Sequence, residues 1–265
     1  MPKGMSQTAR RFAATLVPLI LIAVSCTSPG FRISPQILHV RPQEIADVLY
    51  NPGMGFADFH FGFDHPPEPG TYPRSTVAYF RWSWADLEPV EGQYAFDLID
   101  RTIDQAKAKG ERLAFRVMSE YRLGSPAWLL AKGVPSIAVG GGRFPDYNNQ
   151  IFLDYHERLI KALGARYGRS PDIDHVDIGS IGCWGEWNTA CCQGVERQCQ
   201  QYFPTEDVQI AITDWYLKYF PKVPLVMLHG GRLRYAVEHG AGWRGDCFGD
   251  YGYFSRNWNH MEHAY

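Results

Sequence analysis

The chain has 265 residues and a formal net charge of −2 at pH 7, with hydrophobic residues at 45% and aromatic residues at 14%. This length suits one large domain or two small ones, and the composition supports a sizeable core and excludes a largely disordered chain. The balanced charge predicts no nucleic-acid partner, because nucleic-acid binders usually carry a basic excess.

The first 26 residues have the pattern of an export signal. Three basic residues precede an apolar run of 13 residues at 12–24, which is too short to span a bilayer comfortably at about 20 residues. Cys26 then resembles the lipidated cysteine of bacterial lipoproteins; ordinary cleavage nearby and an uncut membrane anchor are the alternatives. We expect residues 1–26 to be a signal peptide, 27–50 a tether and lead-in, and the protein to be exported to the periplasm or cell surface and anchored to the membrane by its lipid.

Five further cysteines are candidates for disulfides, which an oxidising compartment favours: Cys183, Cys191, Cys192, Cys199 and Cys247. Cys191 or Cys192 with Cys199 would close one loop. Cys183 could pair with the other vicinal cysteine or with Cys247, which leaves one thiol over. A zinc site and free thiols are the alternatives, although no CxxC pair is present.

Beyond residue 50, short apolar runs alternate with helical stretches, which is typical of an α/β fold with a parallel sheet. The expected strands are 55–61, 76–82, 112–118, 175–181, 223–228 and, more weakly, 247–251. The expected helices are 96–109 ended by Gly110, 149–167, 205–220 capped by Thr205, and 232–239. We expect a flexible loop at 140–142. Right-handed crossovers make such a series a (β/α) barrel or a doubly wound sheet, and the absence of GxGxxG and Walker motifs disfavours nucleotide binding.

The ends of these strands hold the candidate substrate-binding residues, because barrel function gathers at the carboxyl edge of the sheet. They are Arg81, Trp82, Arg116, Glu120, Trp128, Trp184, Trp187, Asn188, His229 and Asp250. Either arginine, Arg81 or Arg116, could orient a carboxylate or bind a sugar hydroxyl, and Glu120 could accept from a hydroxyl or pair with Arg122. The tryptophans are stacking platforms for sugar rings or parts of the core, and His229 binds substrate or is structural.

Glu186 is the candidate catalytic residue. It lies just past an apolar strand, between two tryptophans and two glycines in the segment GCWGEWN at 182–188. Burial against aromatic rings disfavours the charged form of a carboxyl group, which suits a general acid that works near neutral pH. The alternative is a structural glutamate paired with Arg81 or Arg116.

Several segments together resemble the catalytic barrel of clan A glycoside hydrolases, nearest to the family 42 β-galactosidase group and its uncharacterised bacterial relatives. They are RWSWADLEP at 81–89 with EGQYAFD at 91–97, SPAWL at 125–129, the Glu186 segment, and NPGMGF at 51–56. The resemblance implies a TIM-type (β/α)8 barrel over 51–265 and retaining hydrolysis of a carbohydrate. It also implies that Glu186 is the acid/base and that no cofactor or metal is required.

The sequence departs from this family pattern in two places. The clan usually has an asparagine that binds the sugar 2-hydroxyl immediately before the acid/base, where this chain has Gly185. The clan's nucleophile follows a seventh strand, and we expect the chain to end after about six, so no nucleophile is assigned. An inactive carbohydrate-binding barrel and a structural surface lipoprotein are therefore the alternatives to an enzyme.

Overall fold

The computed structural model describes residues 39–44, 55–60, 63–64, 74–120 and 124–246. The chain divides into two units, Met1–Asp47 and Val48–Tyr265, of which the first contributes only the exposed segment 39–44. The expected signal peptide, Cys26, Cys247, Asp250 and the expected strand 247–251 therefore lie outside the described residues. None of the helices in the described ranges is both long and apolar enough to cross a membrane.

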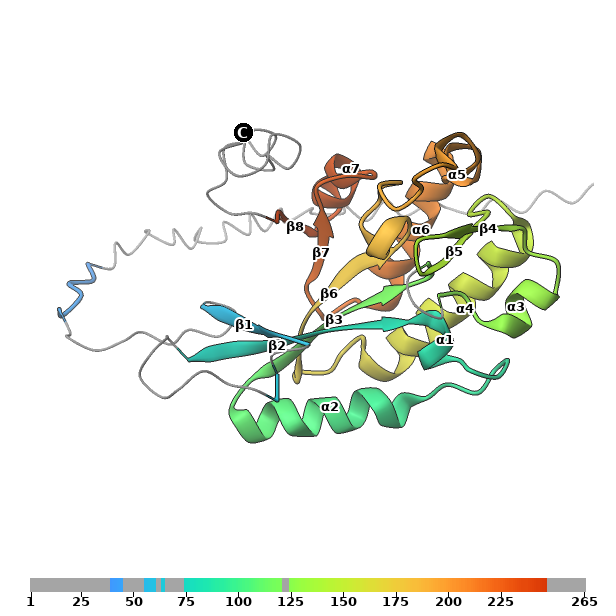
Figure 1. Cartoon of the computed structure of the whole chain (residues 1–265). Helices are drawn as coiled ribbons and strands as arrows, with labels where there is room; N and C mark the ends of the chain where they lie inside the picture. Colours follow the sequence, from blue (N-terminus) through green and yellow to red (C-terminus); the bar gives the residue numbers. More distant parts are fainter. Residues whose placement is uncertain (1–38, 45–54, 61–62, 65–73, 121–123, 247–265) are drawn as a thin grey trace, which may run out of the picture. The chain divides into compact units, whose positions relative to one another are not determined.

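The second unit is built on a six-stranded parallel sheet in the order β1-β2-β3-β6-β7-β8 (Figure 1). Its strands are β1 (Phe56–Phe59), β2 (Ser75–Ser83), β3 (Arg112–Met118), β6 (Ile173–Ser180), β7 (Leu225–Leu228) and β8 (Gly242–Arg244). The sheet curls into part of a barrel that, in the described ranges, is open between β1 and β8. This confirms the predicted TIM-type α/β architecture with about six strands.

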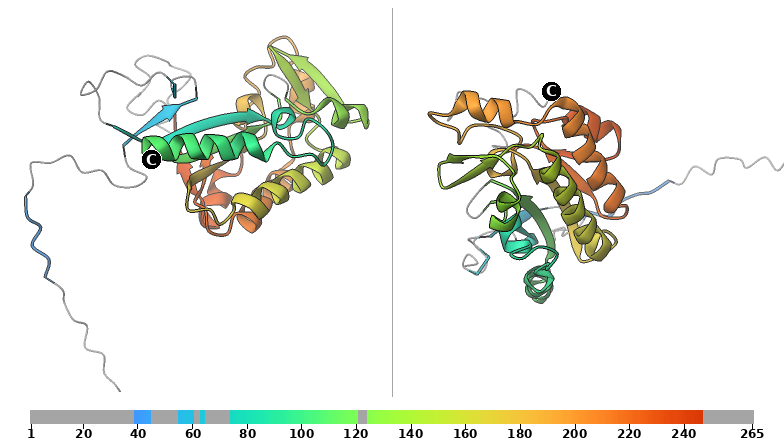
Figure 2. Two further views of the ribbon diagram at one scale, coloured as in Figure 1. Left: turned by 90° about the horizontal axis from the view of Figure 1, so that it is seen from below. Right: turned by 90° about the vertical axis from the view of Figure 1, so that its right-hand side faces the viewer.

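The helices between the strands lie along the outer side of this sheet (Figure 2). They are α2 (Phe96–Lys109), α4 (Gln150–Tyr167), α6 (Glu206–Tyr219) and α7 (Leu233–Glu238). Gly110 ends α2 in the left-handed region at φ 75°. The side chain of Asn149 begins α4 by accepting hydrogen bonds from the backbone N–H groups of Ile151 and Phe152. The predicted helices are thus confirmed to within one residue at each end. The predicted cap of α6 is wrong in its detail, because Thr205 takes the N-cap position without a side-chain hydrogen bond.

Strand alternation separates an outer apolar layer from an inner polar one. On β2, Phe80 and Trp82 point to the helices and join the main core, which also contains Phe115 of β3. Their neighbours on the opposite face form a small separate cluster in which Tyr79 is the largest side chain. The inner face therefore has little apolar cover, and the charged residues of the strands are found there.

Short elements account for what the pattern did not predict. They are α1 (Trp84–Leu87), α3 (Ala127–Ala131), β4 (Ser136–Val139), β5 (Gly142–Pro145), the 3-10 helix η1 (Cys183–Gly185), α5 (Glu196–Tyr202) and the strand β8 given above. The expectation of a flexible loop at 140–142 is wrong, because β4 and β5 pair as an antiparallel hairpin. Gly140 and Gly141 form its two-residue turn, and Gly141 has φ 91°, which glycine adopts without steric cost.

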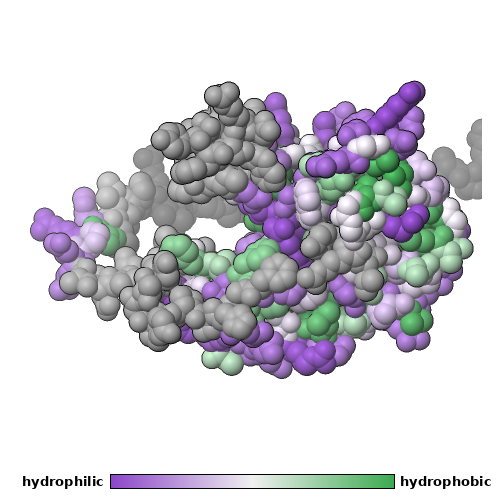
Figure 3. All heavy atoms as spheres, in the orientation of Figure 1, coloured by the Kyte–Doolittle hydropathy of each residue, from purple (hydrophilic) through white to green (hydrophobic). Residues whose placement is uncertain are grey.

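The face of the molecule drawn in Figure 3 is mixed in character. In Figure 3, hydrophobic areas are small and separated by hydrophilic residues. Among the described residues, each edge strand leaves a large apolar side chain exposed, Phe56 on β1 at 58% and Trp243 on β8 at 50%. The strands between them are covered on their outer side by helices.

His156 of α4 predicts an acid-sensitive stability. It is fully buried among Trp84, Phe152 and Trp215, and neither ring nitrogen has a hydrogen-bond partner. Burial lowers the pKa of His156 from 6.5 to about 3. Between these two values the unfolded chain binds a proton that the folded chain does not, so stability falls as the pH is lowered, by up to about 1.4 kcal/mol per pH unit.

We therefore expect His156→Phe to flatten the fall in the free energy of unfolding between pH 6.5 and 4, which urea titrations at several pH values measure. His239→Gln, at an exposed histidine, controls for the loss of a histidine as such. An unchanged pH slope in His156→Phe would contradict the assignment.

Candidate active site

Three charged residues lie side by side on the inner face of the sheet. Arg81 on β2 is in register with Arg116 on β3, and Arg116 is in register with Asp177 on β6. Arg116 is completely buried, and Asp177 is 1% exposed. Charges this deeply buried require partners. The register of β2, β3 and β6 provides them by placing these three side chains next to one another.

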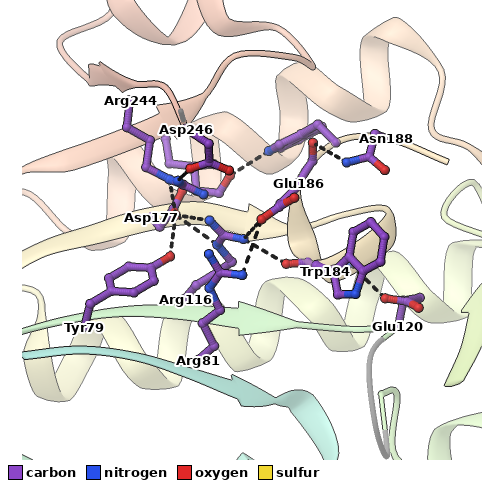
Figure 4. Close-up of polar contacts among 12 residues, drawn as sticks. Tyr79, Arg81, Arg116, Glu120, Asp177, Trp184, Glu186, Asn188, Arg244 and Asp246 are labelled. Carbon is purple, nitrogen blue, oxygen red and sulfur yellow. Dashed lines mark hydrogen bonds and ion pairs between the residues drawn. The ribbon is translucent and has the colours of Figure 1, made fainter. Parts of the chain in front are cut away.

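Asp177 is the centre of this network (Figure 4). Its Oδ2 accepts hydrogen bonds from the Tyr79 hydroxyl at 2.8 Å, from Arg116 Nε and Nη2 at 2.9 and 2.7 Å, and from Arg244 Nε at 2.7 Å. Burial, together with the Asp177 charge, raises the pKa of Tyr79, so its hydroxyl stays protonated and donates. Burial alone would lower the pKa of Arg116. The opposing effect of Asp177, Tyr79 and Glu186 is larger, so the net shift of this pKa is upward.

Glu186 is held by two arginines at the carboxyl end of β6. Its Oε1 lies 3.0 Å from Arg116 Nη1 and 3.3 Å from Arg81 Nη1, and the residue is 9% exposed. The Arg81 guanidinium also lies over the rings of Phe59 and Tyr79, at 5.0 and 5.4 Å from their centroids. The structure thus brings Arg81, Arg116 and Glu186 together, in the paired arrangement given above as the alternative to aromatic burial.

The loop that presents Glu186 has an unusual backbone. In the described part of the chain, the non-glycine residues with positive φ are Ser180, Trp184 and Trp187, at 66°, 56° and 54°. Each such residue costs about 1–3 kcal/mol and persists only where its surroundings enforce it, which is common at functional sites. All three lie within the eight residues 180–187, so the strain is confined to the segment that carries Glu186.

The structure gives a physical reason for Gly185. Its φ is +71°, and a Cβ at this position would lie 3.0 Å from Arg116 Cδ and 3.2 Å from the backbone nitrogen of Ser180. The stem of Arg116 therefore occupies the space that a side chain at 185 would need. The asparagine that the family pattern places at this position would therefore require Arg116 to shift.

The other candidate residues are divided between the site and the core. Trp184 joins the site through its backbone: its carbonyl accepts from Arg116 Nη1 at 2.9 Å. Asn188 donates to the Glu186 carbonyl at 3.3 Å and so holds the loop itself. The half-buried His229 donates its backbone N–H to Arg244.

Three tryptophans make their contacts elsewhere. Trp82, 5% exposed, faces the helices, and Trp128 donates to the Glu88 carbonyl at 2.9 Å. Trp187, 4% exposed, donates to the Ile178 carbonyl at 2.6 Å. The structure therefore does not bring Trp82 or Trp128 to the Glu186 carboxylate, and it buries the ring of Trp187.

Glu120 follows β3 and supports the same loop. It is completely buried, and its Oε2 accepts the backbone N–H of Trp184 at 2.9 Å. Its Oε1 is buried without a hydrogen-bond partner, and burial raises the pKa of Glu120 to about 7. Arg122, its other expected partner, lies outside the described residues.

This environment predicts that Glu120→Gln stabilises the protein at alkaline pH. The folded-state pKa of Glu120 lies above its ordinary value of 4.5, so its stabilising protonation is lost as the pH rises through about 7. We expect the free energy of unfolding at pH 8 to rise by on the order of 1–3 kcal/mol, with little change at pH 4. Urea titrations at both pH values measure this.

Glu91→Gln is the matched control. Hydrogen bonds from Lys132 and Tyr155 lower the pKa of Glu91, so this substitution should bring no gain at pH 8. A loss of stability in Glu120→Gln at pH 8 would contradict the prediction.

Two disulfides hold the segment after β6. They join Cys183 to Cys191 and Cys192 to Cys199, one of the pairings left open by the sequence. The sulfur atoms of Cys183, Cys191 and Cys192 lie within 4.8 Å of one another, but all are bonded in disulfides. They are therefore not available as the thiolate ligands of the zinc alternative.

The sequence reasoning missed Asp177, Tyr79 and Arg244. The signal for the first two was strand parity: Tyr79 lies two residues from Arg81, so both point to one face of β2. Asp177 lies between Val176 and Ile178, which point to the core, so alternation along β6 directs Asp177 to the inner face. Arg244 is the last residue of β8, a strand of three residues that is too short to predict, so only the three-dimensional structure reveals it.

Comparison of the sequence with known proteins identifies a family. The family model described as beta-galactosidase, glycoside hydrolase family 42, matches residues 73–206. The β-galactosidase BglY of Alicyclobacillus acidocaldarius is 31% identical over 126 residues, which cover 44% of this chain and 18% of that protein. A β-galactosidase of an Arthrobacter species is 29% identical over 113 residues, covering 38% of this chain and 16% of that protein. The matches thus span less than a fifth of these relatives.

Solved structures with a similar arrangement include glycoside hydrolases. Endo-glycoceramidase II from Rhodococcus sp. has a TM-score of 0.42 at 13% identity, over 59% of this chain and 42% of that one. The β-galactosidase from Rahnella sp. R3 has a TM-score of 0.40 at 15% identity, over 58% of this chain and 31% of that one. The family model alone covers half of the sequence, and the chain belongs to glycoside hydrolase family 42, the β-galactosidase family.

Proposed function

We propose that the protein hydrolyses β-galactoside-like carbohydrates with retention of configuration, with Glu186 as the acid/base. The observation that carries the proposal is the presentation of a buried carboxylate at the carboxyl end of β6, between Arg81 and Arg116. Glu186 would protonate the leaving oxygen and then deprotonate water. A second carboxylate about 5–5.5 Å away would form the glycosyl-enzyme intermediate, and we assign it to no described residue.

The test is hydrolysis of a panel of aryl glycosides and oligosaccharides by the full chain, followed by proton NMR of the anomeric centre. We expect β-galactosides to be cleaved and the β-anomer of the free sugar to be formed first. Release of the α-anomer first would overturn retention. Absence of turnover across the panel would overturn the proposal that the protein is a glycoside hydrolase.

A second candidate function is a carbohydrate-binding barrel without turnover. It is favoured by the ion pairs of Glu186 Oε1 with Arg81 and Arg116, because a structural glutamate that only holds the loop in place makes the same contacts. Titration calorimetry with the same oligosaccharides separates the two functions. Binding with no product formed supports the binder, and binding with product supports the hydrolase.

We also propose that the protein acts at the cell envelope, held by a lipid on Cys26. Support comes from the basic, apolar and Cys-terminated pattern of residues 1–26. Metabolic labelling with a fatty acid, in the parent and in Cys26→Ala, tests this proposal. Equal labelling of both forms would overturn it.

A further inference from the structure

The segment 181–188 is closed on itself as a tight loop. The backbone N–H of Trp187 donates to the Ile181 carbonyl at 2.9 Å, and that of Cys183 donates to the Asn188 carbonyl at 2.9 Å. Inside this closure, the Glu186 N–H donates to the Cys183 carbonyl at 3.0 Å. The position of Cys183 therefore determines the backbone position of Glu186 directly.

Cys183 is fixed by covalent and non-covalent contacts to the chain beyond the loop. It is completely buried, it is bonded to Cys191, and its Sγ accepts the Cys191 backbone N–H at 3.0 Å. The ring closed by this disulfide spans residues 183–191 and so contains Glu186. The loop also places Trp184 and Trp187 in left-handed conformations that these residues would leave if the closure were released.

The second disulfide is a natural comparison. Cys192–Cys199 closes a ring of nearly the same size, with a sequence separation of 7 against 8. Both of its cysteines are also completely buried. It lies in the same stretch of chain, but its ring begins after Glu186 and ties the chain to α5 instead.

We infer that the Cys183–Cys191 disulfide is the positioning element of the Glu186 carboxylate, whereas Cys192–Cys199 serves only stability. A cross-link that closes a short ring removes conformations from the unfolded chain, and both disulfides do this to a similar extent. Only the first restricts the backbone that presents Glu186 to Arg81 and Arg116. Its loss therefore changes the site as well as the stability.

The experiment compares Cys183→Ser/Cys191→Ser with Cys192→Ser/Cys199→Ser in the full chain. Hydrogen exchange measured by mass spectrometry should show amides 182–188 exchanging at least about tenfold faster in the first variant, and the second should keep the protection of the parent there. Equal protection of these amides in both variants, or equal loss in both, would overturn the inference. This arm is independent of any catalytic activity.

The kinetic arm rests on the proposed function. With a cleaved aryl glycoside, kcat of the first variant should fall by on the order of 10- to 100-fold, because a misplaced catalytic group loses rate steeply. KM should change by no more than about threefold, and the second variant should retain the parental kcat. A fall in kcat of the same size in both variants would overturn the positioning role.

A second double substitution at the same two cysteines keeps the test valid if the serine variant does not fold. Cys183→Ala/Cys191→Val replaces both sulfur atoms with apolar groups and leaves the ring open, and it should show the same faster exchange at 182–188. If the parental chain cleaves no glycoside, the proposed function fails, and the exchange result still decides the inference.

Discussion

Glu186→Gln is expected to lower kcat for an alkyl or oligosaccharide β-galactoside by about 10²–10⁴-fold. The amide has nearly the shape of the carboxyl group, but it can neither protonate the leaving oxygen nor accept a proton from water. Its Oε1 would still accept from Arg116 Nη1, which lies at 3.0 Å in the native site. The loss should therefore come mainly from the chemistry and not from displacement of the loop.

The leaving group sharpens this prediction. A nitrophenyl leaving group departs with little protonation, so the first step in Glu186→Gln should be slowed much less for a nitrophenyl galactoside than for an alkyl galactoside. Glu91→Gln, at a glutamate that pairs with Lys132 away from the inner face, should keep the parental rate. Undiminished activity of Glu186→Gln on both substrates would remove Glu186 from the mechanism, whatever the reaction is.

Helices and strands were predictable from the sequence where they are long and where the residues that define them lie within one segment. The helix at 96–109 and the strand at 112–118 were predicted with the bounds that the structure has, because helical spacing, Gly110 and an apolar run all act within one segment. The hairpin of β4 and β5 has strands of four residues. Such short strands give almost no periodicity, and the turn glycines alone predicted a loop.

The site was predictable only in part, for a related reason. Glu186, Arg81 and Arg116 could be identified because each follows or ends a recognisable strand. Asp177 acquires its role from three partners more than 60 residues away in the chain, Tyr79, Arg116 and Arg244. Contacts of this kind depend on strand register and on the curl of the sheet, which the local pattern of the sequence does not contain.

The same non-local network predicts the largest effect on stability. Arg116→Met should lower the free energy of unfolding by about 3–5 kcal/mol, because removing the central cation of a buried network takes partners from two buried carboxylates at once. Asp177 would retain Tyr79 and Arg244, and Glu186 would retain Arg81. Urea titrations at pH 7 measure the loss. Arg101→Met is the matched control: its ion pair with Asp97 is 66% and 67% exposed, so its removal should change stability by about 0.5 kcal/mol or less.

A double-mutant cycle distinguishes a charge network from simple packing. Asp177→Asn alone leaves Arg116 without its closest carboxylate, at 2.7 Å, and should also be destabilising. In Arg116→Met/Asp177→Asn neither buried charge of the pair remains, so the double variant should be more stable than the sum of the single losses predicts, by about 0.5–3 kcal/mol. Additive losses would mean that Arg116 stabilises the sheet through the packing of its stem, which passes close to Gly179 and Gly185. In that case the ion pair would only orient Glu186.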